Sequence, residues 1–163
     1  MLDERLDGNP YQIEQARRRD AVEISSLYER VWDEYRSEFP DELVRARQPT
    51  VEQMKEWMRH DAYFVAREGS RIVGVVGCSL KYGTCLLMYM VVDREHRKRG
   101  IGSALTERAI KYAKENKAVK VWLDTTPRLK EAISLYEKFE FVRCGHLRKH
   151  YWGEDIYLYE LML

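Results

Sequence analysis

The feature that most constrains the fold is a nearly all-apolar run that leads directly into a basic segment containing glycine. Residues 84–92 read Thr-Cys-Leu-Leu-Met-Tyr-Met-Val-Val, and residues 93–103 read Asp-Arg-Glu-His-Arg-Lys-Arg-Gly-Ile-Gly-Ser. An uninterrupted apolar run is typical of a strand covered on both faces. Apolar residues then return at helical spacing from Ile101 to Ala113. This order predicts a central strand, a tight loop and a helix that begins at the loop.

The loop at residues 97–102 has the parts of an anion-binding site. Free main-chain N–H groups and the positive end of a helix attract phosphate, and glycines at 100 and 102 allow close approach. The helix end contributes only about 0.3–2 kcal/mol, so several N–H bonds and basic side chains must contribute too. A Walker loop is absent, and a dinucleotide fingerprint needs a third glycine where Leu105 stands. We therefore predict a pyrophosphate site of another type.

The remaining periodicities predict strands and helices on both sides of this unit. Period-two alternation indicates strands, and apolar spacings of three and four indicate helices. Strands are expected at residues 11–17, 62–67, 71–80, 119–124, 140–145 and 155–161, and helices at 20–35, 50–58 and 132–139. Asp20 with Glu23, and Thr50 with Gln53, form helix-capping signatures. One loop is expected at the acidic stretch 33–42. A second loop, rich in basic and aromatic residues, is expected between the last two strands.

Length and composition favour one domain over residues 1–163, with residues 1–10 as a loose tail. A chain near this length buries roughly 70% of the surface of its unfolded state. Hydrophobic residues make up 45% and charged residues 34%, which is ordinary for a globular protein. The strand, helix, strand order over residues 84–124 predicts a parallel crossover.

Charge and cysteine content favour a cytoplasmic protein with neither nucleic acid nor membrane as a partner. The net charge of +1 gives no bulk attraction to polyanions. No apolar run approaches the roughly eighteen residues that span a bilayer, and the first ten residues are acidic and polar, unlike a secretion signal. An odd, scattered set of cysteines fits reduced thiols. We expect all of them to be small buried hydrophobes: Cys78, Cys85 and Cys144.

Two segments resemble the signatures of the GNAT acetyltransferases. Residues 97–102 resemble motif A, [RQ]-x-x-G-x-[GA], and residues 132–141 resemble motif B, A-x-x-L-Y-x-x-x-G-F. Glu140 departs from the motif glycine, and Leu129 stands where many members have an asparagine that contacts the cofactor. The resemblance implies an α/β (α+β mixed) GNAT fold. That fold is a mixed, mostly antiparallel, twisted sheet of about seven strands, with a parallel β-α-β crossover and helices on both faces.

The resemblance also implies an acyltransferase that uses acetyl-coenzyme A and no metal. In such enzymes successive amides hold the pyrophosphate, and the pantetheine arm fills a gap between two diverging parallel strands. The residues implied for the cofactor are Met90, Val91, Val92, Arg97, Lys98, Arg99, Gly100, Ile101, Gly102 and Ser103. Tyr136 is implied as the acid that protonates the departing thiolate. A phenol with a pKa near about 10 and a thiol near about 8.5 are close enough for this transfer.

The acceptor must be a neutral amine, because only the neutral form attacks a thioester. At pH 7 roughly a tenth of an α-amine with a pKa of about 8 is neutral. The pKa of a lysine is about 10.4, more than three units above pH 7, so its deprotonation costs about 4–5 kcal/mol. A terminal amine therefore needs only a weak base. The candidates by position are Tyr89, Asp124 and His96 for the base, and Tyr28, Trp32 and Tyr151 for the acceptor wall.

The acceptor and the assembly state stay open between several alternatives. Residues 150–157 resemble an aromatic, glycine and Glu-Asp stretch of N-terminal acetyltransferases related to the ribosomal-protein-modifying enzymes, which implies a peptide N-terminus. Polyamine, amino-acid, antibiotic and other small-amine acetyltransferases share the scaffold. Two non-enzymatic alternatives are a metal module built on Cys144, His146 and His150, and a nucleic-acid patch at residues 94–99. The chain is expected to be a monomer or a homodimer.

Overall fold

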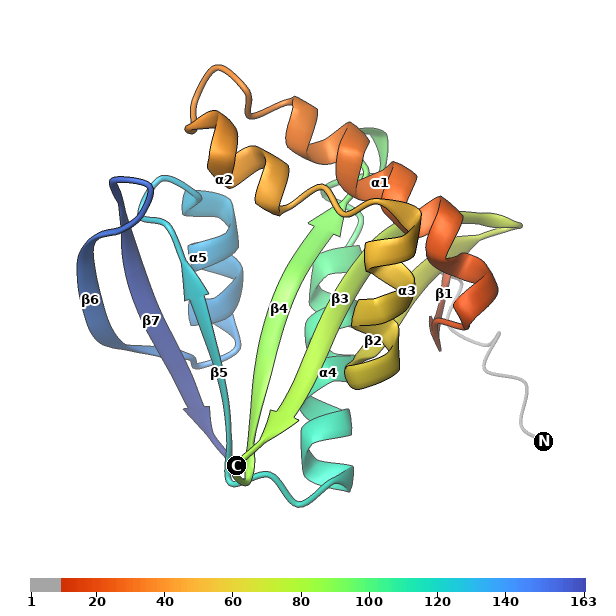
Figure 1. Cartoon of the computed structure of the whole chain (residues 1–163). Coiled ribbons are helices and arrows are strands. Elements are labelled where there is room, and N and C mark those ends of the chain that lie inside the picture. Colours follow the sequence, from red (N-terminus) through yellow and green to blue (C-terminus); the bar gives the residue numbers. More distant parts are fainter. Residues whose placement is uncertain (1–9) are drawn as a thin grey trace.

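A seven-stranded mixed sheet forms the centre of the computed structural model, which describes residues 10–163 (Figure 1). The strands are β1 (Gln12–Gln15), β2 (Ala62–Glu68), β3 (Arg71–Lys81), β4 (Thr84–Val92), β5 (Lys120–Thr125), β6 (Val142–Tyr151) and β7 (Glu154–Met162). Their order is β1-β2-β3-β4-β5-β7-β6, and β4 with β5 is the parallel pair in an otherwise antiparallel sheet. The predicted fold class is confirmed. The predicted loose tail, apart from Pro10, lies outside the described residues.

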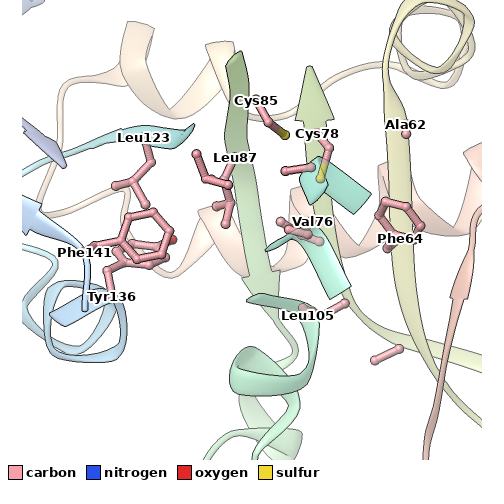
Figure 2. Close-up of a cluster of buried hydrophobic side chains, with 14 of the residues drawn as sticks. Ala62, Phe64, Val76, Cys78, Cys85, Leu87, Leu105, Leu123, Tyr136 and Phe141 are labelled. Atoms are coloured by element: carbon pink, nitrogen blue, oxygen red, sulfur yellow. The ribbon is translucent and has the colours of Figure 1, made fainter. Parts of the chain in front are cut away.

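Helices cover both faces of the sheet and bury two apolar clusters. The helices are α1 (Ala21–Asp33), α2 (Asp41–Ala46), α3 (Val51–His60), α4 (Ile101–Glu115) and α5 (Lys130–Lys138). One cluster lies between the sheet and α4 with α5, and the other lies between the sheet and α1, α2 and α3. Figure 2 shows part of the first cluster, with Leu87 of β4 lying between the cysteines and Tyr136. Strand β4 contributes to both clusters, as its apolar sequence predicts.

Helix α4 lies directly on β3 because one strand residue has no side chain. A Cβ atom added at Gly74 would lie 2.9 Å from Ile101 Cγ2 and 3.1 Å from Leu105 Cδ1. Both of these helix residues are fully buried. The close approach fixes the first turn of α4 beside the end of β4, which is where the basic loop begins.

The parallel pair separates soon after it forms. Strand β4 pairs with β5 only at Cys85 with Val121 and Leu86 with Trp122. In Figure 1 the two strands meet at one end and splay apart toward the other. From residue 87 to residue 92, β4 therefore has no strand partner on its β5 side among the described residues. The predicted gap between diverging parallel strands is present.

A bulge in β4 bends the strand at the point of separation. Val75 of β3 pairs with Val91 of β4, and Gly77 of β3 pairs with Met88 of β4. Between these two pairs, β4 contains one residue more than β3. Tyr89 lies in this bulge with a φ angle of +52°, which is uncommon for a residue with a side chain. Its carbonyl oxygen accepts a hydrogen bond from the Tyr28 hydroxyl at 2.7 Å. The buried tyrosine of α1 thus supports the bulge from behind.

Several local predictions differ from the structure. The capping signature at Thr50 and Gln53 is confirmed, with reciprocal bonds of 3.2 and 2.9 Å. The one at Asp20 is wrong, because that carboxylate accepts the main-chain N–H of Arg17 at 2.8 Å and does not cap α1. The prediction that all cysteines are buried is wrong for Cys144, which lies exposed on β6.

Two segments expected as loops carry regular structure. Helix α2 begins at Asp41, within the last two residues of the loop expected at 33–42. Strand β6 continues to Tyr151 and β7 begins at Glu154, so the expected basic and aromatic loop is a long hairpin with a tight turn. Gly153 has a φ of +86° in this turn, a conformation that glycine adopts without strain. The hairpin brings its aromatic residues back over the end of β5.

Candidate active site

The loop at residues 97–103 forms a cradle of main-chain N–H groups. Gly100 has a φ of +80° and precedes the first residue of α4, and Lys98 has a φ of +62°. Alternation with left-handed residues turns successive amides toward one side. No acceptor among residues 10–163 pairs with the main-chain N–H groups of residues 98–103. An anion placed at this helix start would satisfy groups that are otherwise left to solvent.

A cavity of about 990 Å³ extends from this cradle along the open edge of β4. Its walls come from residues 90–92 of β4, from the start of α4 and from the first turns of α5. The volume is at the upper end of the range for cofactor pockets. Nine of the ten residues implied for the cofactor line it: Met90, Val91, Val92, Arg97, Lys98, Gly100, Ile101, Gly102 and Ser103. Arg99 does not, because its guanidinium pairs with Glu68 at 3.1 Å.

Two acidic residues that follow α1, Glu34 and Glu38, also line the larger cavity. Arg97, the basic residue of motif A, pairs through its guanidinium with Glu34 at 3.0 Å. Its Nε atom also donates to the Val92 carbonyl oxygen at 3.1 Å. Glu38 lies on the same wall. An anion at the cradle therefore meets an arginine that already holds one carboxylate.

Asp93 anchors the base of the cradle. Its carboxylate, 6% exposed, accepts from Arg30 Nε at 2.9 Å and lies 2.9 Å from His96 Nδ1 and 3.7 Å from Arg71. Burial raises the pKa of Asp93, but the hydrogen bonds from Arg30 and His96 outweigh it and the pKa is lowered overall. The second ring nitrogen of His96 lies 3.1 Å from Glu68. His96 is thus held between two carboxylates, which favours a structural role over that of a base.

Replacing the anchor carboxylate is expected to destabilise the fold. We expect Asp93→Asn to lower the free energy of unfolding by about 2 kcal/mol, because it removes hydrogen bonds from charged groups. Since the folded pKa is lowered, the wild-type contribution is complete above the unfolded pKa of about 3.9 and is lost as the pH falls through the folded value. Urea unfolding at pH 7 and at pH 3 measures both effects.

The control for this variant is Asp33→Asn, which removes an exposed carboxylate that also binds an arginine. Exposed ion pairs contribute little, so its unfolding midpoint should stay close to wild type. Equal losses in the two variants would contradict an anchoring role for Asp93.

A second, smaller cavity of about 280 Å³ adjoins the first. The two cavities share four lining residues: Trp32, Met90, Leu129 and Ala132. The smaller one lies over the end of β5, between α2, α5 and the hairpin of β6 and β7. The shared residues place the two cavities side by side at Met90 of β4.

Tyr136 of α5 lines the smaller cavity and is otherwise buried, at 6% exposure. Its ring packs against Phe141 with centroids 5.8 Å apart, and Figure 2 shows both near Leu123. Burial raises the pKa of the Tyr136 phenol well above its ordinary value, and the charge of Asp124 adds to this. The phenol is therefore a weaker acid than the ordinary pKa of about 10 implies. It stays protonated at any physiological pH and is best suited to donating a hydrogen bond.

Asp124 lies at the floor of the smaller cavity and is bonded to a residue of the hairpin. The Tyr151 hydroxyl donates to Asp124 Oδ2 at 2.9 Å, while Oδ1 has no partner among residues 10–163. Burial and then the charge of Asp124 raise the pKa of Tyr151 to about 12. Arg47, which follows α2, lies over the rings of Tyr89 and Tyr151 at 4.7 and 5.8 Å.

The structure brings most, but not all, of the sequence-predicted reaction residues together. Tyr89, Asp124, Tyr136, Tyr151 and Trp32 line the smaller cavity. Tyr28 lines neither cavity, and its place is behind the wall as a support for the bulge. The roles of these residues stay predictions.

Sequence reasoning missed several cavity residues: Arg47, Trp122, Thr125 and Thr126. Arg47 follows a short helix that was not predicted, although Asp41 and Glu42 at its start and Arg45 near its end are typical helix-end residues. Trp122 lies within β5 at the last parallel pair, and Thr125 and Thr126 lie at the end of this strand. For these two threonines, the place at a strand end was the available signal.

A splayed parallel pair beside an amide cradle at a helix start is the arrangement of a coenzyme A-binding acetyltransferase fold. The sequence pattern of the acetyltransferase (GNAT) family matches residues 24–141. The chain therefore belongs to the GNAT acetyltransferase family, and the predicted class, an acyltransferase domain, is confirmed.

Individual relatives agree with this assignment. An N-alpha-acetyltransferase of Sulfolobus acidocaldarius is 34% identical over 66% of this chain and 71% of its own length. Human N-acetyltransferase 8B is 29% identical over 60% of this chain, which spans less than half, 45%, of that protein. The crystal structure of an N-acetyltransferase of Thermoplasma acidophilum in complex with coenzyme A has a TM-score of 0.80, with 14% identity and coverage of 94% and 99% of the two chains. The last comparison supports the fold alone.

Neither non-enzymatic alternative gains a site in the described part of the chain. No group of three or more potential metal ligands gathers among residues 10–163. His146 instead pairs with Asp155 at 2.9 Å. Within the basic segment, Arg97 and Arg99 both hold glutamates. No helix in the described range is long and apolar enough to cross a membrane.

Proposed function

We propose that the chain transfers the acetyl group of acetyl-coenzyme A to the α-amine at the N-terminus of a peptide. The observation that carries the proposal is the junction of the two cavities, where Asp124 and Tyr136 lie on the acceptor side of the open β4 edge. The choice of a peptide N-terminus is supported by the N-alpha-acetyltransferase name of the Sulfolobus relative. A small-molecule amine is the alternative, since the scaffold alone does not select the acceptor.

The cofactor would be held by main-chain groups. Residues 98–103 supply amides for the pyrophosphate, and the unpaired edge of β4 from residue 87 to 92 supplies groups for the pantetheine amides. The bound cofactor supplies an activated thioester. A main-chain N–H at the open strand end would polarise its carbonyl oxygen.

The side chains of the smaller cavity would orient the amine and assist the leaving thiolate. The free Oδ1 oxygen of Asp124 can accept a hydrogen bond from the amine as it approaches. Tyr136, kept protonated by burial and by the charge of Asp124, can donate a hydrogen bond to the thiolate. Direct attack is the step proposed, because a neutral α-amine is already available near pH 7.

The acceptor class is tested by comparing amines at equal concentration. We expect a peptide with a free N-terminus to be acetylated, with kcat/KM rising up to about pH 8, where the α-amine becomes neutral. The same peptide with a blocked N-terminus and a free lysine should be a poor acceptor. Mass spectrometry locates the acetyl group, and thiol release gives the rate. Turnover with polyamines and none with peptides would favour the small-molecule alternative.

We also propose that the protein is located in the cytoplasm. The cysteines at positions 78, 85 and 144 are all free thiols in the structure, which fits a reducing compartment.

A further inference from the structure

Two residues of opposite charge line the smaller cavity. They are Asp124, whose Oδ1 oxygen has no partner among residues 10–163, and Arg47. Tyr151 contacts both, because its hydroxyl donates to Asp124 Oδ2 and its ring lies under the Arg47 guanidinium.

The Arg47 guanidinium has no carboxylate or hydrogen-bond partner among residues 10–163. Two arginines of the cofactor cavity differ in this respect: Arg97 holds Glu34, and Arg128 holds Glu154. The contacts of Arg47 with the rings of Tyr89 and Tyr151 use its charge but leave its N–H donors unused. A planar guanidinium with free donors is suited to binding a carboxylate through two parallel hydrogen bonds.

The position of Arg47 restricts which carboxylate it can reach. The cavity that Arg47 lines is small, about 280 Å³, and Asp124 and Tyr136 line it as well. The half-buried setting of Arg47 also weakens solvent screening of its charge. A carboxylate of the acceptor that binds Arg47 would therefore lie close to the acceptor's amine.

We propose that Arg47 binds a carboxylate of the acceptor and makes the enzyme selective for acidic acceptors. This inference rests on the proposed acetylation of amines and names the acceptor class within it. The chemistry is an amine with a carboxylate a few bonds away. An Asp or Glu side chain in the first two residues of a peptide supplies it, and so does the α-carboxylate of a free amino acid.

The test uses peptides that differ by one charge, with Glu or Gln at the first or the second position and the same sequence after it. We expect the wild-type kcat/KM to be about 10- to 100-fold higher for the Glu peptide, as hydrogen bonds to a charged group provide. Arg47→Gln should remove this preference, so that its kcat/KM values for the Glu and Gln peptides become equal. Arg45→Gln is the matched control, because Arg45 is exposed on α2, pairs with Asp41 and should keep the preference.

A parallel arm distinguishes the two sources of the carboxylate. Free amino acids are compared with their amides, which lack the α-carboxylate. A preference for the acid over the amide, lost in Arg47→Gln, identifies the free amino acid as the source, and a preference restricted to acidic peptides identifies the side chain.

Two outcomes overturn the inference. Equal kcat/KM values of the wild type for charged and neutral partners in both arms would exclude a carboxylate subsite. An equal loss for all acceptors in Arg47→Gln would show that Arg47 only supports the aromatic wall. Neither outcome affects the proposed function, which fails only if no peptide with a free N-terminus is acetylated while acetyl-coenzyme A still binds.

Discussion

Gly100→Arg is expected to lower the affinity for acetyl-coenzyme A at least 100-fold. Gly100 has a φ of +80°, and a residue with a side chain pays about 1–2 kcal/mol to adopt this conformation. Relief of that strain would rotate the amides of residues 100–103 away from a common anion. The arginine side chain would also stand at the mouth of the cavity that these residues line. Isothermal titration with acetyl-coenzyme A measures the loss.

The matched control is Gly69→Arg. Gly69 has a similar φ of +61° in the turn between β2 and β3, and no atom lies within 4 Å of an added Cβ. Both variants carry the same backbone strain and the same added charge, so their stabilities should fall by similar amounts. Only Gly100→Arg should lose the cofactor. Tight binding by a folded Gly100→Arg protein would contradict the cradle.

The cofactor side of the site was predictable because its chemistry is local in sequence. Residues 97–102 contain the basic side chains, the two glycines and the helix start in one continuous segment. A main-chain anion site needs only that continuity. The apolar run at residues 84–92 predicted the strand before this segment. Gly74 of β3 then allows α4 to pack close to the sheet. Most strands of the sheet were predicted because their apolar patterns are likewise local in sequence.

The acceptor side was predictable only in part because its residues meet through tertiary contacts. Asp124 and Tyr151 were named as candidates, but Arg47 and the contacts among the three were not. Arg47 comes from the end of α2, Asp124 from β5 and Tyr151 from β6, and no spacing in the sequence relates them. The hairpin that brings Tyr151 to Asp124 was expected to be a loop. The pKa of Tyr136 is a further example, since burial and a neighbouring carboxylate raise it and neither is visible in motif B.

Tyr136→Phe is expected to leave acetyl-coenzyme A binding unchanged and to lower kcat about 100-fold. The ring that packs on Phe141 is retained, and the lost hydroxyl makes no hydrogen bond within residues 10–163, so the stability should change little. The loss reflects the hydrogen bond to the departing thiolate. Because the pKa of Tyr136 is raised, wild-type kcat should not fall through ionisation of this phenol below about pH 10. Steady-state kinetics across pH measures both effects.

The choice of leaving group separates this role from a structural one. A hydrogen bond to the leaving sulfur matters less when the thiolate is more stable, so an acetyl donor with a more acidic thiol should reduce the Tyr136→Phe effect. A packing defect would slow both donors equally. Tyr112→Phe is the control, because this tyrosine packs on Phe64 from α4 and lines neither cavity. If Tyr136→Phe turned over with undiminished kcat, the phenol would have no part in the reaction, and the thiolate of coenzyme A would depart without assistance from a side chain.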